Sequence, residues 1–120
     1  MSYGFEITID NLNSNQPVFR FVKPLLVPPR WTKATINLNS FAIYAKRSGA
    51  WDYKHPLWGI GLEFGSYLKI QEISYGIVPE GFTETIKAQP LLFEETYQVN
   101  GTAAGGYGDG EFILSGPSDR

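Results

Sequence analysis

His55 is the only histidine of the chain, and it lies three residues after Asp52 in the stretch AWDYKHPLW. A carboxylate beside an imidazole can orient the ring for general-base catalysis, so this pair is the one candidate for a hydrolase. A single imidazole does not make a zinc site without other strong ligands, and the chain has no cysteine to add a thiolate. We expect His55 to be an ordinary loop residue, and a hydrolase that relies on it is the third hypothesis for function.

Two acidic pairs, Glu80 with Glu84 and Glu94 with Glu95, fall in expected turns or on exposed strand faces. Solvent keeps both members of such a pair ionised, whereas a glycosidase needs one of its two carboxyls to have a raised pKa. Asp109 and Glu111 lack the regular oxygen-ligand spacing of a calcium loop. The sequence therefore predicts no catalytic residue, no metal site and no cofactor, and we expect the protein not to be an enzyme.

Large aromatic residues in expected loops are the least ordinary feature of the sequence. Trp31 follows PPR, and Trp51 and Tyr53 lie in AWDYKHPLW, where exposed aromatics pack against the fold or bind something. The predicted binding residues are Arg30, Trp31, Arg47, Trp51, Tyr53, Lys54 and His55. Since Trp, Tyr and Arg dominate protein interfaces, the leading hypothesis is a module that binds another protein, such as an inhibitor, an immunity protein or an assembly component. The alternative is a carbohydrate-binding module in which the three aromatic side chains stack on sugar rings.

The net charge of −2 gives no overall attraction to nucleic acid or to anionic membrane, so a nucleic-acid partner is not expected. The charge is unevenly distributed, because residues 11–60 hold seven basic residues and one acid, whereas residues 80–120 hold two basic residues and seven acids. Such a dipolar surface can steer a charged partner or a second copy of the chain. We expect any weak homodimer to form through this charge contrast or through the last strand, residues 111–115.

Composition favours one all-β domain that covers residues 1–120. Aromatic residues make up 15% and charged residues 18%, with 13 glycines and 8 prolines, a balance typical of strands and turns. No apolar run has the length of a membrane span, and MSYGFEITID lacks the basic start and apolar stretch of a signal peptide. As written, the sequence predicts a cytoplasmic protein, with secretion or a periplasmic location open if a leader was removed.

The stretch LLFEETYQV, residues 91–99, places turn-forming acids between a leucine and Tyr97, and an alternating strand follows. It resembles the tyrosine corner of immunoglobulin-like and fibronectin type III sandwiches, where a tyrosine hydroxyl bonds to upstream backbone. The resemblance implies an antiparallel β-sandwich of seven to nine strands, with Tyr97 buried and bonded near residues 91–94. It implies no function, since such sandwiches carry many.

Alternation along the chain predicts further details. Trp58 is expected in the core, Asn39 and Ser40 mark a turn or bulge, and a change of parity between Ile70 and Ile73 indicates a second bulge. GGYGDG is expected to be the tip of a hairpin that joins residues 97–103 to residues 111–115.

Overall fold

The computed structural model describes residues 5–26, 29–33, 35–104 and 106–115, and for residues 23–26 and 29–33 it describes the backbone alone. These residues form eleven strands and no helix, so the predicted all-β class is confirmed, with more strands than expected. The strands are β1 (Phe5–Asp10), β2 (Val18–Leu26), β3 (Pro29–Lys33), β4 (Ile36–Arg47), β5 (Ala50–Trp51), β6 (Trp58–Gly61), β7 (Leu68–Ile70), β8 (Glu72–Ser74), β9 (Thr83–Ile86), β10 (Thr96–Ala103) and β11 (Gly106–Ile113). No helix able to cross a membrane occurs in the described ranges.

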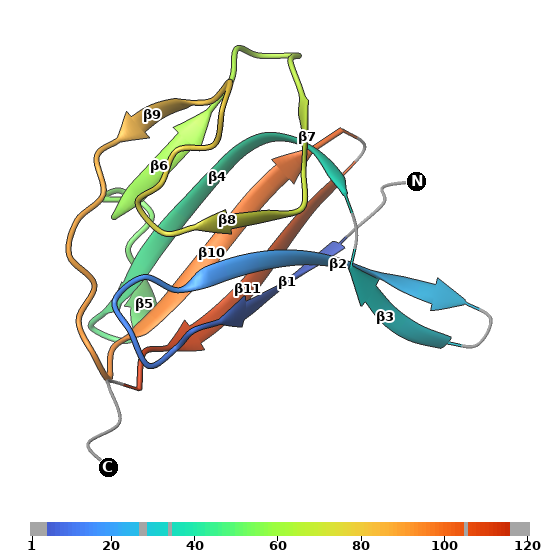
Figure 1. Cartoon of the computed structure of the whole chain (residues 1–120). Coiled ribbons are helices and arrows are strands. Elements are labelled where there is room, and N and C mark those ends of the chain that lie inside the picture. The colour runs from blue at the N-terminus through green and yellow to red at the C-terminus, as the bar shows by residue number, and fades with distance from the viewer. Residues whose placement is uncertain (1–4, 27–28, 34, 105, 116–120) are drawn as a thin grey trace.

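The strands form one hydrogen-bonded sheet that curls around a single core (Figure 1). Eight of them follow the order β3-β2-β1-β11-β10-β4-β6-β9, while β5 and β7 pair with β4 and β8 pairs with β2. β1 runs parallel to β11, and the other pairs are antiparallel. The ladders thus describe a curled sheet, and the immunoglobulin-like sandwich stays a prediction.

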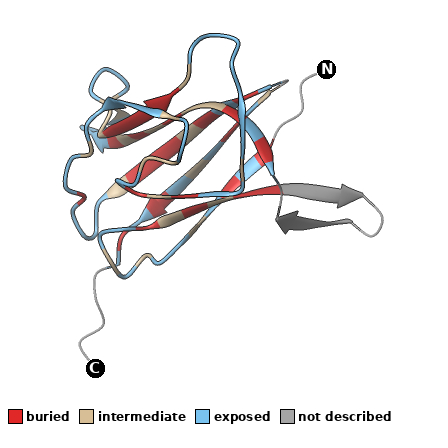
Figure 2. Cartoon of the chain, turned by 45° about the horizontal axis from the view of Figure 1, so that its top comes forward, coloured by how far each residue is buried: buried red, intermediate tan, exposed pale blue. Residues whose placement is uncertain are grey.

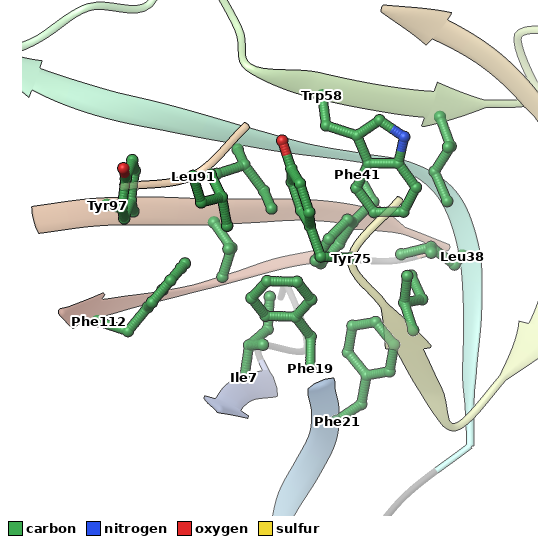
Figure 3. Packing of buried hydrophobic residues seen from close by; sticks show 14 of the residues in the cluster. Ile7, Phe19, Phe21, Leu38, Phe41, Trp58, Tyr75, Leu91, Tyr97 and Phe112 are labelled. Carbon is green, nitrogen blue, oxygen red and sulfur yellow. The ribbon is translucent and has the colours of Figure 1, made fainter. Parts of the chain in front are cut away.

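The core is built from the apolar residues that alternate along the central strands (Figure 2). Phe19 and Phe21 from β2 point toward Phe41 of β4, whose ring also meets the indole of Trp58 edge-on at 6.3 Å between centroids (Figure 3). Trp58 is fully buried, as predicted, and its indole N–H donates a 2.8 Å hydrogen bond to Glu84 of β9. Each such side chain stabilises the fold by about 1.5–3 kcal/mol on burial.

The predicted tyrosine corner is present. The Tyr97 side chain is buried, and its hydroxyl accepts a hydrogen bond from the Leu92 amide at 2.7 Å and donates one to the Leu92 carbonyl at 3.2 Å. Glu94, between these residues, has a positive φ of 68°, which bends the chain into β10. The corner fixes where β10 begins.

Of the two predicted bulges, one is confirmed and one is wrong. In the pairing of β10 with β4, Thr102 faces Ser40 but Ala103 faces Leu38, so Asn39 is an extra residue. The parity change between Ile70 and Ile73 has another cause, because the chain crosses there from β7, which pairs with β4, to β8, which pairs with β2. The two isoleucines bury their side chains from different parts of the curled sheet.

The expected hairpin tip at GGYGDG is wrong. The turn lies earlier, between Ala103 and Gly106, which pair with each other, and the rest of the glycine-rich stretch belongs to β11. Its glycines allow β1 to approach closely, since a Cβ on Gly108 would lie 2.4 Å from the carbonyl oxygen of Phe5 and one on Gly110 would lie 2.6 Å from that of Ile7. Close approach of a neighbouring backbone is a second reason for glycine in a strand, besides turn formation.

The last strand, through which a weak homodimer is expected, is not an outer strand of the sheet. β11 lies between β10, which pairs with its whole length, and β1, which pairs with it at Gly108 and Asp109. The path through the sheet ends instead at β3 and β9. Residues 111–113 thus belong to an interior strand, and self-association through residues 111–115 stays a prediction.

Candidate functional site

Polar side chains collect on the outer face of the sheet, opposite the core. On β10 the odd residues from Tyr97 to Ala103 are buried, so the even residues point outward. They form a depression of about 350 Å³ with neighbours from β11 and from the loop after β5. Its lining residues are Tyr53, Gln98, Asn100, Gly101, Thr102, Tyr107 and Asp109. Small-molecule sites span roughly 300–1,000 Å³, so this depression has room for one ring-sized ligand.

Tyr53 reaches the sheet because both ends of its loop are bonded to β4. The Asp52 amide donates to the Ala45 carbonyl at 2.9 Å, and the Leu57 amide donates to the Ile43 carbonyl at 2.8 Å. The loop between these bonds lays the Tyr53 hydroxyl 2.9 Å from Oε1 of Gln98, to which it donates. Gln98 is only 9% exposed, and the remaining donors and acceptor of its side-chain amide can meet a ligand.

Two tyrosine rings border the depression. The Tyr53 ring lies at the Gln98 end and packs edge-on against Tyr44, with 5.0 Å between centroids. Tyr107 of β11 pairs with Thr102 at the other end, and 69% of its surface is exposed. Gln98 and Thr102 are four residues apart on one strand, or about 13 Å. Aromatic rings therefore stand on both sides of a polar floor.

A second, smaller depression of about 230 Å³ adjoins the first across β4 and shares Asn100 and Thr102 with it. Its floor is low because small residues face outward there, namely Ser40 and Ala42 of β4 and Gly59 of β6. The other lining residues are Phe41, Tyr44, Pro56, Ile60, Thr85 and Ile86.

The charges around the first depression are acidic. Among the described residues, Asp109 is the one charged residue that lines it, Glu6 of β1 is paired with Asp109, and Glu111 follows two residues later on the same outward face. No basic side chain in the described part of the chain lines either depression. Burial, and then the neighbouring Tyr53, raises the pKa of Tyr44, so its hydroxyl stays neutral at physiological pH. The face is thus suited to an uncharged or cationic ligand that offers hydroxyl or amide groups.

The His55–Asp52 pair predicted as a weak catalytic candidate does form. Nδ1 of His55 lies 3.1 Å from both carboxylate oxygens of Asp52, and Nε of Arg47 lies 3.5 Å from one of them. Partial desolvation pushes the pKa of Asp52 up, but the hydrogen bond and charge of His55, with the charge of Arg47, hold it below its ordinary value. In the described part of the chain His55 hydrogen-bonds Asp52 and no hydroxyl, so the pair ties the loop to the β4–β5 hairpin without a nucleophile beside it.

The predicted binding residues divide into two separate groups. Arg47, Trp51, Tyr53, Lys54 and His55 share the β4–β5 hairpin and the loop after it. The neighbouring Lys46 ammonium lies 5.6 Å from the Trp51 ring centroid, as in a cation–π contact. Of the five residues in this group, Tyr53 alone lines the first depression.

Arg30 and Trp31 belong to β3, and their side chains lie outside the described part of the structure. β3 precedes the start of β4, whereas β5 follows its end, and twelve residues of strand span about 40 Å. The two groups consequently lie at opposite ends of β4 (Figure 1), and the expected single surface from Arg30 to Trp58 is corrected to two.

Sequence reasoning missed most of the depression, namely Gln98, Asn100, Thr102 and Tyr107. Their alternation with Tyr97, Val99 and Gly101 shows that they face outward, but only the pairing of β10 with β4 and β11 shows which other residues they meet. Asp109 and Glu111 do share a face, as their spacing suggests, and within the described ranges no group of three or more acidic or histidine side chains is placed to hold a metal ion.

Comparisons with known proteins add no family to this geometry: no protein-family model matches the chain, and neither the curated proteins nor the solved structures yield a match.

Proposed function

We propose that the protein is a non-enzymatic carbohydrate-binding module whose site is the outer face of the sheet between Tyr53 and Tyr107. The observation that carries this proposal is the polar floor of Gln98, Asn100 and Asp109 between two aromatic rings. Sugars present hydroxyls, which pair with amide and carboxylate groups, and apolar ring faces, which pack on aromatic rings. Of the three aromatic residues predicted for sugar binding, only Tyr53 belongs to the proposed site. Its second aromatic ring is Tyr107, and the proposed site includes neither predicted tryptophan.

Two features of the floor suit a hydroxyl-rich ligand better than a peptide. The backbone groups of β10 and β11 are paired within the sheet, so a ligand on this face meets side chains alone. A peptide strand would instead need an unpaired sheet edge. The acidic Asp109 disfavours phosphate-bearing ligands, because a like charge beside a phosphate is repulsive.

The experiment is a glycan array followed by calorimetric titration of the bound glycan. Tyr107→Ala and Asn100→Ala should each weaken binding about 10-fold or more, which corresponds to about 1.4 kcal/mol. Tyr67→Ala is the matched control, because Tyr67 is an exposed tyrosine outside both depressions. The proposal is wrong if no glycan binds, or if binding is insensitive to both site variants.

A protein partner is the second candidate, and the loop around Trp51 favours it. Trp51 with Lys46, and Arg47 with a 64% exposed side chain, give the aromatic and cationic groups that dominate interfaces. Affinity capture with the intact protein and with Trp51→Ala tests this candidate. A partner that is lost with Trp51→Ala and kept with Tyr107→Ala would assign the function to this loop and against sugar.

We further propose that the curled sheet is an immunoglobulin-like sandwich in architecture. The Tyr97 corner and the core tryptophan support that assignment. An experimental structure compared with known sandwiches tests it.

A further inference from the structure

The two depressions on the outer face lie along one row of paired residues. Gly59 of β6 pairs with Ala42 of β4, Ala42 pairs with Asn100 of β10, and Asn100 pairs with Asp109 of β11. Neighbouring strands are about 4.8 Å apart, so the row runs about 14 Å across the sheet. Because the pairs are in register, these positions follow one line at right angles to the strands.

The row passes through both depressions, which together we call the groove. Asn100 and Thr102 line both depressions, so the two are adjacent and share these residues as a border. Tyr44 and Pro56 border the groove on one side, and Ser40 and Thr102 are the outward residues on the other.

Gly59 keeps the far end of the groove open. A Cβ at this position would lie 2.8 Å from Oγ1 of Thr85 and 3.3 Å from Cγ1 of Ile86, both on β9. Any side chain there would therefore displace the Thr85 hydroxyl, which now lines the groove. The end at Gly59 offers a hydroxyl and apolar surface, whereas the end at Asp109 offers a carboxylate, so the two ends differ in chemistry.

We infer that this groove binds a linear chain of at least two uncharged sugar units that lies across the strands, with one unit at Asn100–Asp109 and the next at Gly59–Thr85. The inference rests on the proposed sugar-binding function and deepens it. A single pyranose ring does not span a row of about 14 Å, so a monosaccharide would fill one depression and leave the other to water. Acids stand at one end of the groove, and none of its described lining residues is basic, which selects against uronic acid, sialic acid or sulfated units.

The test is a chain-length series of the glycan identified on the array, from one to four units, titrated calorimetrically into the intact protein. We expect affinity to rise at least fivefold from the monosaccharide to the di- or trisaccharide and then to level off. Ala42→Leu narrows the groove where the two depressions meet, and Thr85→Phe fills its far end on an exposed strand. Both should reduce the ratio of trisaccharide to monosaccharide affinity to near one, whereas Tyr67→Phe should preserve the ratio.

Two results would overturn the extended groove alone. One is equal affinity for one and three units, and the other is a length dependence that survives both Ala42→Leu and Thr85→Phe. A cooperative thermal unfolding transition shows that each variant is folded. If one variant does not fold, the other still tests the groove, because Ala42 is on β4 and Thr85 is on β9. Failure of every glycan to bind at any length would instead remove the proposed function itself.

Discussion

The hydroxyl of Tyr53 donates a 2.9 Å hydrogen bond to Oε1 of Gln98, which joins the loop after β5 to the outer face of β10. These residues are 45 positions apart in sequence. The bond places an aromatic ring beside the polar floor. The proposed site therefore depends on a contact between a loop and a strand.

Removing that hydroxyl should free the middle of the loop and leave its ends bonded. In Tyr53→Phe we expect faster hydrogen exchange at the amides of Tyr53 and Lys54. The amides of Asp52 and Leu57 should stay protected, because they donate to carbonyls of β4. Exchange followed by NMR measures each amide separately. Unchanged exchange at Tyr53, or loss of protection at Leu57 as well, would show that the bond to Gln98 does not position the loop.

Tyr97→Phe keeps the ring of the tyrosine corner and removes both hydrogen bonds to Leu92. The free energy of unfolding should fall by about 1–3 kcal/mol, because the Leu92 amide and carbonyl both lose their hydrogen bonds to the hydroxyl. Urea unfolding of this variant beside Tyr67→Phe, whose ring is 45% exposed, gives the comparison. Equal unfolding midpoints in the two variants would mean that the corner does not stabilise the fold.

Gly108→Ala should disturb the pairing of β1 with β11. The new Cβ would lie 2.4 Å from the Phe5 carbonyl oxygen, so the strands must separate at a cost of about 1–3 kcal/mol or more. Gly61→Ala is the matched control, since its Cβ would meet its nearest atom at an ordinary 3.6 Å. The account of the glycine-rich strand fails if both variants unfold at the same denaturant concentration.

Tyr75 should make the protein sensitive to alkali. Burial raises the pKa of the Tyr75 hydroxyl above its ordinary value. The same hydroxyl donates a hydrogen bond to the Gln89 carbonyl. The unfolded chain releases this proton at about pH 10, before the folded protein does, so the stabilisation is complete below about pH 10 and is lost as pH rises toward the folded pKa. Unfolding free energies measured from pH 8 upward should show the advantage of wild type over Tyr75→Phe shrinking above pH 10. A constant difference across that range would contradict the assignment.

The sequence was sufficient for features that depend on local pattern. Alternation indicated the central strands, although Trp31 and Trp51, which were expected in loops, lie in β3 and β5. The Asn39 bulge followed from a change of parity, and the spacing of Tyr97 after Leu91 predicted the corner. Each of these is fixed by side-chain period or by a short turn, which neighbouring residues determine.

Features that depend on which strands pair with each other could not be predicted from the sequence. The glycines of GGYGDG favour a turn when considered locally, and only the presence of β1 beside β11 explains why a strand needs them. In the same way, Tyr53 and Tyr107 are 54 positions apart in the sequence, and the order β11-β10-β4 alone places them around one depression. Sheet order is a long-range property, so the candidate site emerged only with the fold.

The most direct test of the central claim, that the outer face binds sugar, is an NMR titration of the isotopically labelled protein with the array-selected oligosaccharide. We predict that the side-chain amides of Gln98 and Asn100 and the backbone amides of Thr102 and Tyr107 shift together, with one dissociation constant. Shifts confined to residues 46–51, or no shifts at saturating sugar, would contradict the claim. A protein partner that binds the loop around Trp51 would then be the leading hypothesis.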